Sequence, residues 1–218
     1  MKKIGLIADI HSNLVALKAV LEDMPEVEKI LCAGDLVGYG PQPKETIELV
    51  KSKDVTSCMG NHDYAVAKND FHSLTNDARK AAEWTREKLG KNELSFLNGL
   101  KEKIQLKIEN YEIFIAHGTP RKPLKEYLYP STSNRALLKM TQEANSDIIL
   151  LGHTHIPLKK SIQGKIILNP GAVGQPRDRN PKASYMLMEI GEEIEIAEKR
   201  IKYDIEKTTE KIEQFELP

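Results

Sequence analysis

Five short motifs in this chain place metal-binding types of side chain directly after apolar segments. The motifs are Asp9-x-His11, Gly34-Asp35, Gly60-Asn61-His62-Asp63, His117-Gly118 and Gly152-His153-x-His155. Five of the six histidines lie in these motifs, and only His72 lies elsewhere. This concentration of histidine at the ends of apolar segments predicts that the motifs meet at one site.

The spacing within the motifs suits two divalent ions. Asp9 and His11 flank a single residue, so both can point from one strand end at the same ion. Asp35 has two carboxylate oxygens and is the expected bridge between the ions. The predicted ligand set is Asp9, His11, Asp35, Asn61, His117, His153 and His155.

The ligand types also indicate which ions bind and what they do. Mixed imidazole and carboxylate ligands suit manganese, iron, zinc, nickel or cobalt better than magnesium or calcium, and manganese is expected first. Such a pair, about 3.5–4 Å apart, lowers the pKa of a bridging water, so that hydroxide can act as the nucleophile at neutral pH. Two carboxylates leave the charge of two dications uncancelled, so the site should attract phosphate esters.

Four further residues are candidates for catalysis or substrate binding. His62 could contact a phosphoryl oxygen or protonate the leaving alkoxide, and Asp63 could orient it. Arg177 could contact phosphate, with a surface salt bridge as an equal alternative. Asn13 could lie near the metals, although an Asn in a first helical turn is more often a start signal.

The elements that carry the motifs follow from the apolar pattern. Strands at 4–8, 29–33 and 55–59 alternate with a helix from 12 to 24, capped by Ser12, and a helix after Pro43, which is a βαβαβ arrangement. The stretch 75–100 predicts a long and a short helix that are separated near Gly90. In open α/β sheets the carboxyl ends of the strands form the ligand crevice, so the motifs should converge there.

The second half of the chain predicts hairpins around one more buried strand. A hairpin joins 104–108 to 111–116, an ordered loop spans 119–130, a helix spans 134–144 and a strand spans 148–151. Two further hairpins turn at 163–164 and 191–192, and a charged helix follows. Tyr127 and Tyr129, in the ordered loop, could gate the substrate or anchor the loop onto the core. We expect one domain over residues 1–218.

These motifs, in this order, resemble the calcineurin-like metallophosphoesterase superfamily. The stretches GDLVGYGPQP, GNHD, GHTH and NPGAVGQPRD resemble its prokaryotic phosphodiesterase-like branch, and the resemblance covers about residues 1–185. It implies an α/β fold, a four-layer sandwich of two mixed β-sheets flanked by helices. It also implies that His62 is the catalytic histidine. The implied ligands are Asp9, His11, Asp35 and His155 for one metal, and Asp35, Asn61, His117 and His153 for the other.

One stretch departs from the superfamily's protein phosphatases. Those enzymes carry an Asp that orients the catalytic histidine, followed by Arg-Gly, shortly after the Gly-Asp motif. This chain has Leu-Val-Gly-Tyr-Gly at 36–40. The difference argues against a protein phosphatase and leaves the orienting partner of His62 unassigned.

Composition narrows the class of partner. The 32 basic and 32 acidic residues balance, so no extended nucleic-acid binding is signalled, and a nuclease is disfavoured. No apolar run approaches the length of a membrane span, and we expect a cytoplasmic protein. The two cysteines, Cys32 and Cys58, suit small buried strand residues. The oligomeric state is left open.

The expected function is hydrolysis of small phosphate esters, most of all nucleotide-derived phosphodiesters, by metal-bridging hydroxide. Dinucleoside polyphosphate hydrolysis and protein phosphatase activity are alternatives that the same site could support. A non-catalytic metal-binding scaffold of the same fold, as in the retromer subunit, is an alternative of another class. The presence of His62 beside the full ligand set argues against that scaffold.

Overall fold

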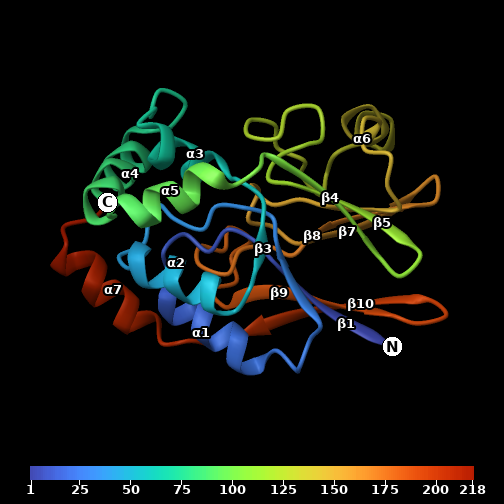
Figure 1. The fold of residues 1–218 in the computed structure, drawn as a ribbon, viewed down its shortest axis with the longest axis horizontal. Helices are drawn as coiled ribbons and strands as arrows, with labels where there is room; N and C mark the ends of the chain where they lie inside the picture. Colours follow the sequence, from blue (N-terminus) through green and yellow to red (C-terminus); the bar gives the residue numbers. More distant parts are fainter.

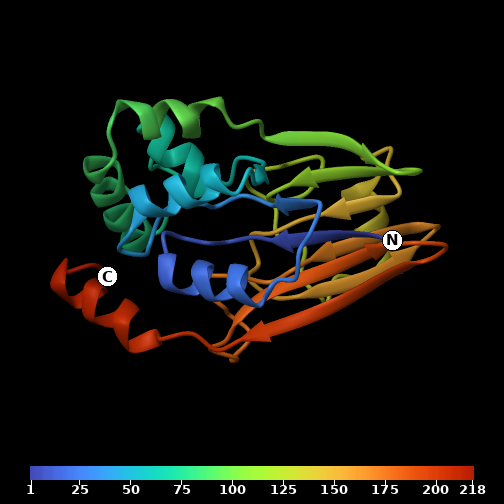
Figure 2. The same cartoon turned by 60° about the horizontal axis from the view of Figure 1, so that its bottom comes forward.

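The computed structural model describes all 218 residues and is built around two five-stranded sheets that pack face to face (Figures 1 and 2). Sheet A has the order β10 (Ile194–Ile201), β9 (Ala183–Ile190), β1 (Lys2–Ile7), β2 (Lys29–Cys32), β3 (Thr56–Ser57). Sheet B has the order β4 (Lys103–Ile108), β5 (Tyr111–Ala116), β6 (Ile148–Leu150), β8 (Lys165–Asn169), β7 (Leu158–Ile162). The neighbours β1, β2 and β3 are parallel, as are β5, β6 and β8, whereas the four other neighbouring pairs are antiparallel. Both sheets are therefore mixed, as predicted.

The alternation of side chains along each strand separates two cores. In β2 and the residue after it, Leu31 and Ala33 pack between the sheets, whereas Cys32 faces the other side. The core between the sheets also contains Ile115 and Leu150 from sheet B. This double burial explains why the strands read as nearly continuous apolar runs.

Helices cover the outer faces of both sheets. The outer face of sheet A packs against α1 (Leu14–Asp23), α2 (Pro43–Ser52), α3 (Asn61–Lys68), α4 (Asn76–Lys88) and α5 (Lys91–Gly99). The outer face of sheet B packs against α6 (Asn134–Thr141). The last helix, α7 (Ile205–Gln214), lies beside α1 (Figure 1). The four-layer sandwich predicted from the resemblance is confirmed.

The cap of α1 differs from the prediction. The side chain of Asn13, rather than that of Ser12, accepts the hydrogen bond from the Ala16 amide, at 3.1 Å. Ser12 has a left-handed backbone with φ of 54°, and its buried hydroxyl has no partner. The left-handed residue Ser12 turns the chain sharply before the helix, so the N-cap is Asn13 and not Ser12.

One helix was missed by the sequence pattern. Helix α3 begins at Asn61, inside the motif that we expected to end a strand, and β3 is only two residues long. The Asp63 carboxylate accepts a hydrogen bond from the Gly60 amide at 3.0 Å, which is a capping-box contact. The three predicted hairpins and the break between α4 and α5 are present.

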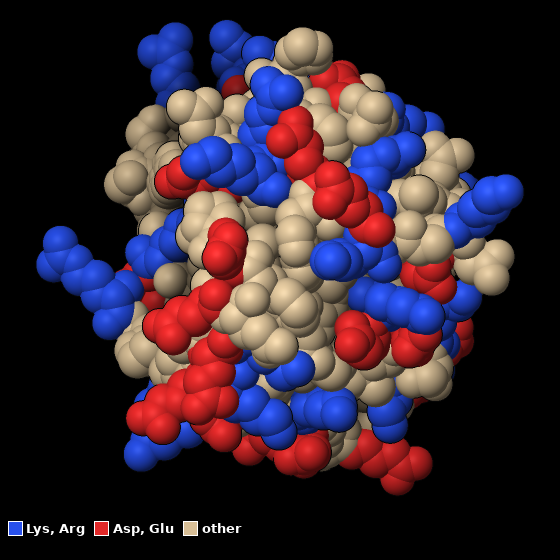
Figure 3. Space-filling view, turned by 90° about the vertical axis from the view of Figure 1, so that its left-hand side faces the viewer, with Lys and Arg blue, Asp and Glu red and all other residues tan.

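The surface carries charge of both signs. On the face drawn in Figure 3, Lys and Arg side chains alternate with Asp and Glu side chains, in keeping with the 32 residues of each sign. None of the seven helices combines the length and apolar character that crossing a membrane requires.

Candidate metal centre

All seven predicted ligands gather where the carboxyl ends of β1, β2, β5 and β6 lie beside the start of α3. Asp9 and His11 follow β1, Asp35 follows β2 and His117 follows β5. His153 and His155 follow β6, and Asn61 opens α3. Three overlapping groups have ligand atoms close enough to share an ion: Asp9, His11 and His155; His11, Asp35 and His62; Asp35, His117 and His153.

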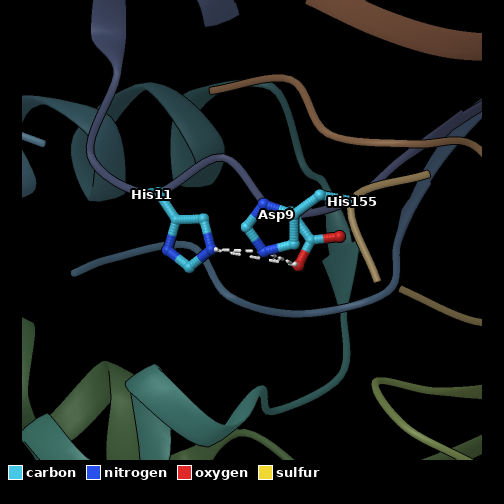
Figure 4. A group of neighbouring side chains, drawn as sticks. All are labelled: Asp9, His11 and His155. Carbon is cyan, nitrogen blue, oxygen red and sulfur yellow. Dashed lines mark hydrogen bonds and ion pairs between the residues drawn. The ribbon is translucent and has the colours of Figure 1, made fainter. Parts of the chain in front are cut away.

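The first group is built around one oxygen of Asp9. The Nε2 atoms of His155 and His11 lie 3.4 Å and 3.9 Å from Oδ1 of Asp9 (Figure 4). The two Nε2 atoms lie 3.2 Å from each other. All three side chains are at most 2% exposed, so water cannot screen the contacts.

Backbone carbonyls determine which ring nitrogens of this group carry protons. Nδ1 of His11 lies 3.1 Å from the Val37 carbonyl, and Nδ1 of His155 lies 2.6 Å from the Gln175 carbonyl. A carbonyl only accepts, so Nδ1 must be the protonated nitrogen in both rings. The two neutral rings then direct bare Nε2 lone pairs at each other, which repel unless a cation lies between them.

The group of Asp35, His117 and His153, called the second group below, repeats the arrangement around Asp35. Nδ1 of His117 lies 2.8 Å from the Ala33 carbonyl, so Nδ1 is its donor. Its Nε2 lies 3.1 Å from Oδ2 of Asp35 and 3.0 Å from Oδ1 of Asn61. His153 completes the group, and its buried Nε2 has no hydrogen-bond partner. The first group has no donor among its inward-facing atoms, and the second has only the proton that His117 Nε2 shares with Asp35, which a divalent cation would replace.

Asp35 connects the two groups. Its Oδ2 lies 3.6 Å from Nε2 of His11, as well as 3.1 Å from Nε2 of His117. Its Oδ1 accepts the backbone amide of His62 at 2.9 Å. Asp35 therefore lies between the two groups, and its part as a bridge between metals stays a prediction.

Burial sets the protonation states of the site. It lowers the pKa of His153 to about 2 and that of His155 to about 3. Burial also raises the pKa of Asp9 to about 7. His117 is the exception: burial lowers its pKa, but the Asp35 carboxylate more than offsets this and raises it to about 9. Without a metal, a proton is therefore the cation that His117 and Asp35 share.

Much of this site has strained backbone. Asp9, His11, Asp35, His153 and His155 all have positive φ, between 47° and 70°. Gly60 is required by close approach, because a Cβ there would lie 2.0 Å from Oδ1 of Asp35. Backbone strain of this kind clusters at functional sites, because surrounding contacts must hold it in place.

His62 lies at the edge of the first group, against Tyr39. Its ring centroid is 4.9 Å from that of His11 and 4.5 Å from that of Tyr39. Nδ1 of His62 is buried without a partner, and a Cβ on Gly38 would lie 2.5 Å from it. Burial lowers the pKa of His62, so the neutral ring prevails at neutral pH.

Asp63 makes contacts other than the predicted one with His62. Its Oδ1 accepts the Val37 amide at 3.1 Å, and its Oδ2 accepts the Gly60 amide at 3.0 Å. These bonds join the loop after β2 to the start of α3. They give Asp63 a structural part and leave it with no hydrogen bond to the His62 ring.

The two candidate substrate contacts are placed differently. The Asn13 side chain is 4% exposed and bonds to the Ala16 amide, the Gly174 carbonyl and Thr208, so it is occupied within the protein. Arg177 is exposed, and its guanidinium carbon lies 5.8 Å from the centroid of the Tyr39 ring. Burial is the main cause of the lowered pKa of His155, and the charge of Arg177 is the next, so the guanidinium lies close enough to act on the centre. It makes no salt bridge, the alternative that we considered.

Two aromatic residues lie at the opening. Sequence reasoning assigned no part to Tyr39, and for Tyr127 it considered gating of the substrate or anchoring of the loop, not a contact with a proposed metal ligand. Tyr39 packs between the His62 ring and Arg177. Tyr127 stacks on His153, with ring centroids 3.7 Å apart and planes inclined by 14°. Only the position of Tyr39, four residues after Asp35, was a signal that the sequence could have offered.

Comparison with known proteins identifies the family. A family model for the calcineurin-like phosphoesterase superfamily domain matches residues 1–193. An uncharacterized protein of Methanocaldococcus jannaschii is 37% identical over 235 residues, covering 99% of this chain and 93% of the relative. The phosphodiesterase YfcE of Escherichia coli is 25% identical over 202 residues, covering 87% of this chain and 88% of the relative.

A solved structure agrees with this match. The crystal structure of a metallophosphoesterase from Sphaerobacter thermophilus has a TM-score of 0.85 and 33% identity, covering 100% of this chain and 95% of that chain. The family model spans most of the chain, and its fold implies divalent metal ions at the clustered His and Asp side chains. This protein therefore belongs to the calcineurin-like phosphoesterase superfamily and is a phosphoesterase hydrolase.

Proposed function

We propose that this protein hydrolyses small, nucleotide-derived phosphodiesters with two divalent transition-metal ions, manganese first. The observation that carries the proposal is the pair of buried acceptor clusters that share Asp35. Each cluster brings imidazole nitrogens and carboxylate oxygens together, and the only donor between them is the proton that His117 shares with Asp35. Two cations relieve that repulsion, and mixed nitrogen and oxygen ligands favour manganese, iron, zinc, nickel or cobalt.

The proposed ligand sets overlap at Asp35. One ion is assigned to Asp9, His11, Asp35 and His155, and the other to Asp35, Asn61, His117 and His153. The carbonyl partners of His11, His117 and His155 support this assignment, because they hold each ring with Nε2 directed inward. When bound, such a pair supplies Lewis acidity and activates a water as the nucleophile.

Residues of the chain do the remaining work on the phosphate. Arg177 is assigned to a non-bridging phosphoryl oxygen, because its guanidinium lies close enough to act on the centre and is free of a carboxylate partner. His62 is assigned to the leaving-group side. In its neutral form it has one N–H, which can hold a phosphoryl oxygen or pass a proton to the leaving oxygen.

Two alternatives fit the site less well. Dinucleoside polyphosphates carry several charges beyond the scissile phosphate, whereas Arg177 is the only arginine or lysine among the main charges that shift the pKa values of Asp9, His11 and His155. A protein phosphatase of this family would orient its histidine through an Asp, and Gly38 occupies the space beside Nδ1 of His62. A non-catalytic scaffold would not require His62.

The test is metal-restored hydrolysis. Chelator-stripped protein is reloaded with manganese, nickel, zinc or magnesium and assayed on bis(4-nitrophenyl) phosphate beside 4-nitrophenyl phosphate. We expect turnover to return with transition metals and to favour the diester, and His62→Ala to reduce it at equal metal content. The absence of turnover with any metal, at an occupancy near two per chain, would contradict the proposal and favour a scaffold.

A further inference from the structure

A loop beside the centre exposes an aromatic ring in an unusual way. In the loop between β5 and α6, Leu128 is 3% exposed and belongs to the core of sheet B, whereas Tyr127 is 41% exposed. Leu128 therefore anchors the loop, and Tyr127 is not needed for that purpose. Tyr127 is instead stacked on His153, one of the proposed metal ligands.

The loop is held firmly in this position. Glu126 accepts hydrogen bonds from Thr119 at 2.5 Å and from Nε of Arg121 at 2.7 Å. The Lys122 amide also bonds to the Thr119 carbonyl at 3.0 Å. These contacts fix the backbone beside Tyr127. Stacking on His153 and on Tyr129, with ring centroids 3.7 Å and 5.7 Å away, orients the Tyr127 ring before any ligand arrives, which lowers the entropic cost of binding on its exposed part.

A cleft opens from the centre along this ring. It has a volume of about 900 Å³, and its lining includes Tyr127 and the proposed ligand Asn61, together with Tyr64 and His72. Cavities of roughly 300–1,000 Å³ are typical of small-molecule sites. The space is therefore large enough for an organic group attached to a phosphate at the centre.

The charges that line the cleft cancel. Glu126 is paired with Arg121, which leaves Lys122 and Lys125 against Asp70 and Glu102. A substituent that carries additional phosphates gains no electrostatic binding energy from such a surface. A planar, uncharged group gains from stacking on the tyrosine and loses little on leaving water.

We propose that this cleft binds an uncharged nucleoside arm of the phosphodiester, with its base on Tyr127. The inference rests on the proposed function and specifies its substrate class. His62 contacts Tyr39 and His11, whereas Tyr127 contacts His153. The leaving group therefore faces His62, and the arm on Tyr127 is the one that stays with the phosphate.

The test compares esters with one leaving group and different retained arms. The probes are thymidine 5′-(4-nitrophenyl phosphate), methyl 4-nitrophenyl phosphate, and the thymidine ester with an added 3′-phosphate. We expect kcat/KM for the thymidine ester to exceed that for the methyl ester by about 10-fold or more, since base stacking on an aromatic side chain has effects of this size. The added 3′-phosphate should bring no further gain.

Three variants locate the effect on the ring. Tyr127→Ala should reduce the thymidine-to-methyl ratio to near one, whereas Tyr127→Phe should keep it, because stacking needs the ring and not the hydroxyl. Tyr129→Ala removes the neighbouring exposed ring, which stacks on Tyr127 with centroids 5.7 Å apart, and should reduce the ratio less than Tyr127→Ala does. A second readout is calorimetric binding of thymidine 5′-monophosphate and deoxyribose 5-phosphate to manganese-loaded protein. Thymidine 5′-monophosphate should bind more tightly than deoxyribose 5-phosphate, and Tyr127→Ala should remove that difference in affinity.

The outcomes separate this inference from the proposed function. Turnover of both esters with a ratio near one in the unaltered protein would overturn the nucleoside assignment and leave the hydrolase intact. An unchanged ratio in Tyr127→Ala, or loss of metal from that variant, would also overturn it, the latter because the ring would only support His153. No turnover of any ester would contradict the proposed function itself.

Discussion

The buried floor of the centre and its exposed rim are held by different kinds of contact. The floor, which is the seven proposed metal ligands, is fixed by backbone carbonyls and amides at strand ends, such as the Ala33 carbonyl on His117. The rim, which is Tyr39, Tyr127 and Arg177, is fixed by ring stacking and by long side chains. The floor therefore belongs to the sheets, whereas the rim can change without altering them.

This difference separates chemistry from specificity. Changes to the floor should abolish metal binding and turnover of every ester together. Changes to the rim should alter which ester is preferred and how tightly it binds. The following predictions test that division, beginning with the change that should have the largest effect.

Asp35→Asn should have the largest effect, because Asp35 touches both acceptor groups. Loss of one of two carboxylates from the floor should reduce metal occupancy and lower turnover by about 10²- to 10³-fold, the several kcal/mol that metal ions contribute to such reactions. Elemental analysis and diester hydrolysis measure the two effects. Full occupancy with unchanged turnover would place the ions elsewhere.

Gly38→Ala should impair turnover without removing metal. Gly38 has φ of 91°, and a Cβ would lie 2.5 Å from Nδ1 of His62, so the ring must move. We expect a loss of about 10²-fold, the lower part of the range for a misplaced acid–base group. Gly164→Ala is the control, because Gly164 also has positive φ, of 78°, but nothing lies within 4 Å of its Cβ position. Equal losses in both variants would mean that backbone strain alone is responsible.

Arg177→Gln should weaken substrate binding through the rim. Loss of a charged hydrogen bond of about 1.5–3 kcal/mol should lower kcat/KM by about 10- to 100-fold at full metal occupancy. Arg179→Gln is the matched control, since Arg179 is an exposed arginine two residues away with no salt bridge. Equal effects from both would indicate general electrostatic attraction rather than a direct contact.

Metal binding should strengthen as pH rises. His117, with its pKa raised to about 9, and Asp9, raised to about 7, must both lose a proton before they can bind an ion. The apparent affinity for the metal should rise about tenfold per pH unit until the pH reaches the pKa of the ligand whose proton the ion displaces. Calorimetry in buffers of different ionisation enthalpy counts the released protons. Affinity that is flat between pH 6 and 8 would contradict these protonation states.

Asp63→Asn should have the smallest effect on chemistry. The amide can accept only one of the bonds from the Val37 and Gly60 backbone, so about 1–3 kcal/mol of stability should be lost. The midpoint temperature of thermal unfolding should fall by several degrees. Glu87→Gln, an exposed substitution on α4, should not change that temperature. If turnover fell sharply with no change in thermal unfolding, Asp63 would instead orient His62.

The sequence predicted the floor because each of its side chains directly follows an apolar strand or its glycine. Strand ends leave little freedom, so residue type and order were enough to bring Asp9 and His155 together. The apolar pattern likewise predicted the strands, whereas their division into two sheets came from the resemblance to the superfamily. Helix α3 was missed because it begins inside a motif, although Asp63, three residues after Gly60, was a capping signal.

The rim could not be predicted in the same way. Tyr127 meets His153 only because Glu126, Arg121 and Thr119 hold a loop without regular structure. Asn13 appeared free in the sequence, but the C-terminal segment brings Tyr203 and Thr208 onto its side chain. Contacts between distant segments of this kind have no local signature.

The most direct test of the dinuclear centre is anomalous diffraction from crystals of manganese-loaded protein, recorded on both sides of the manganese absorption edge. The account predicts two anomalous peaks about 3.5–4 Å apart on either side of the Asp35 carboxylate, one among Asp9, His11 and His155 and the other among Asn61, His117 and His153. A single peak, or peaks away from Asp35, would contradict it.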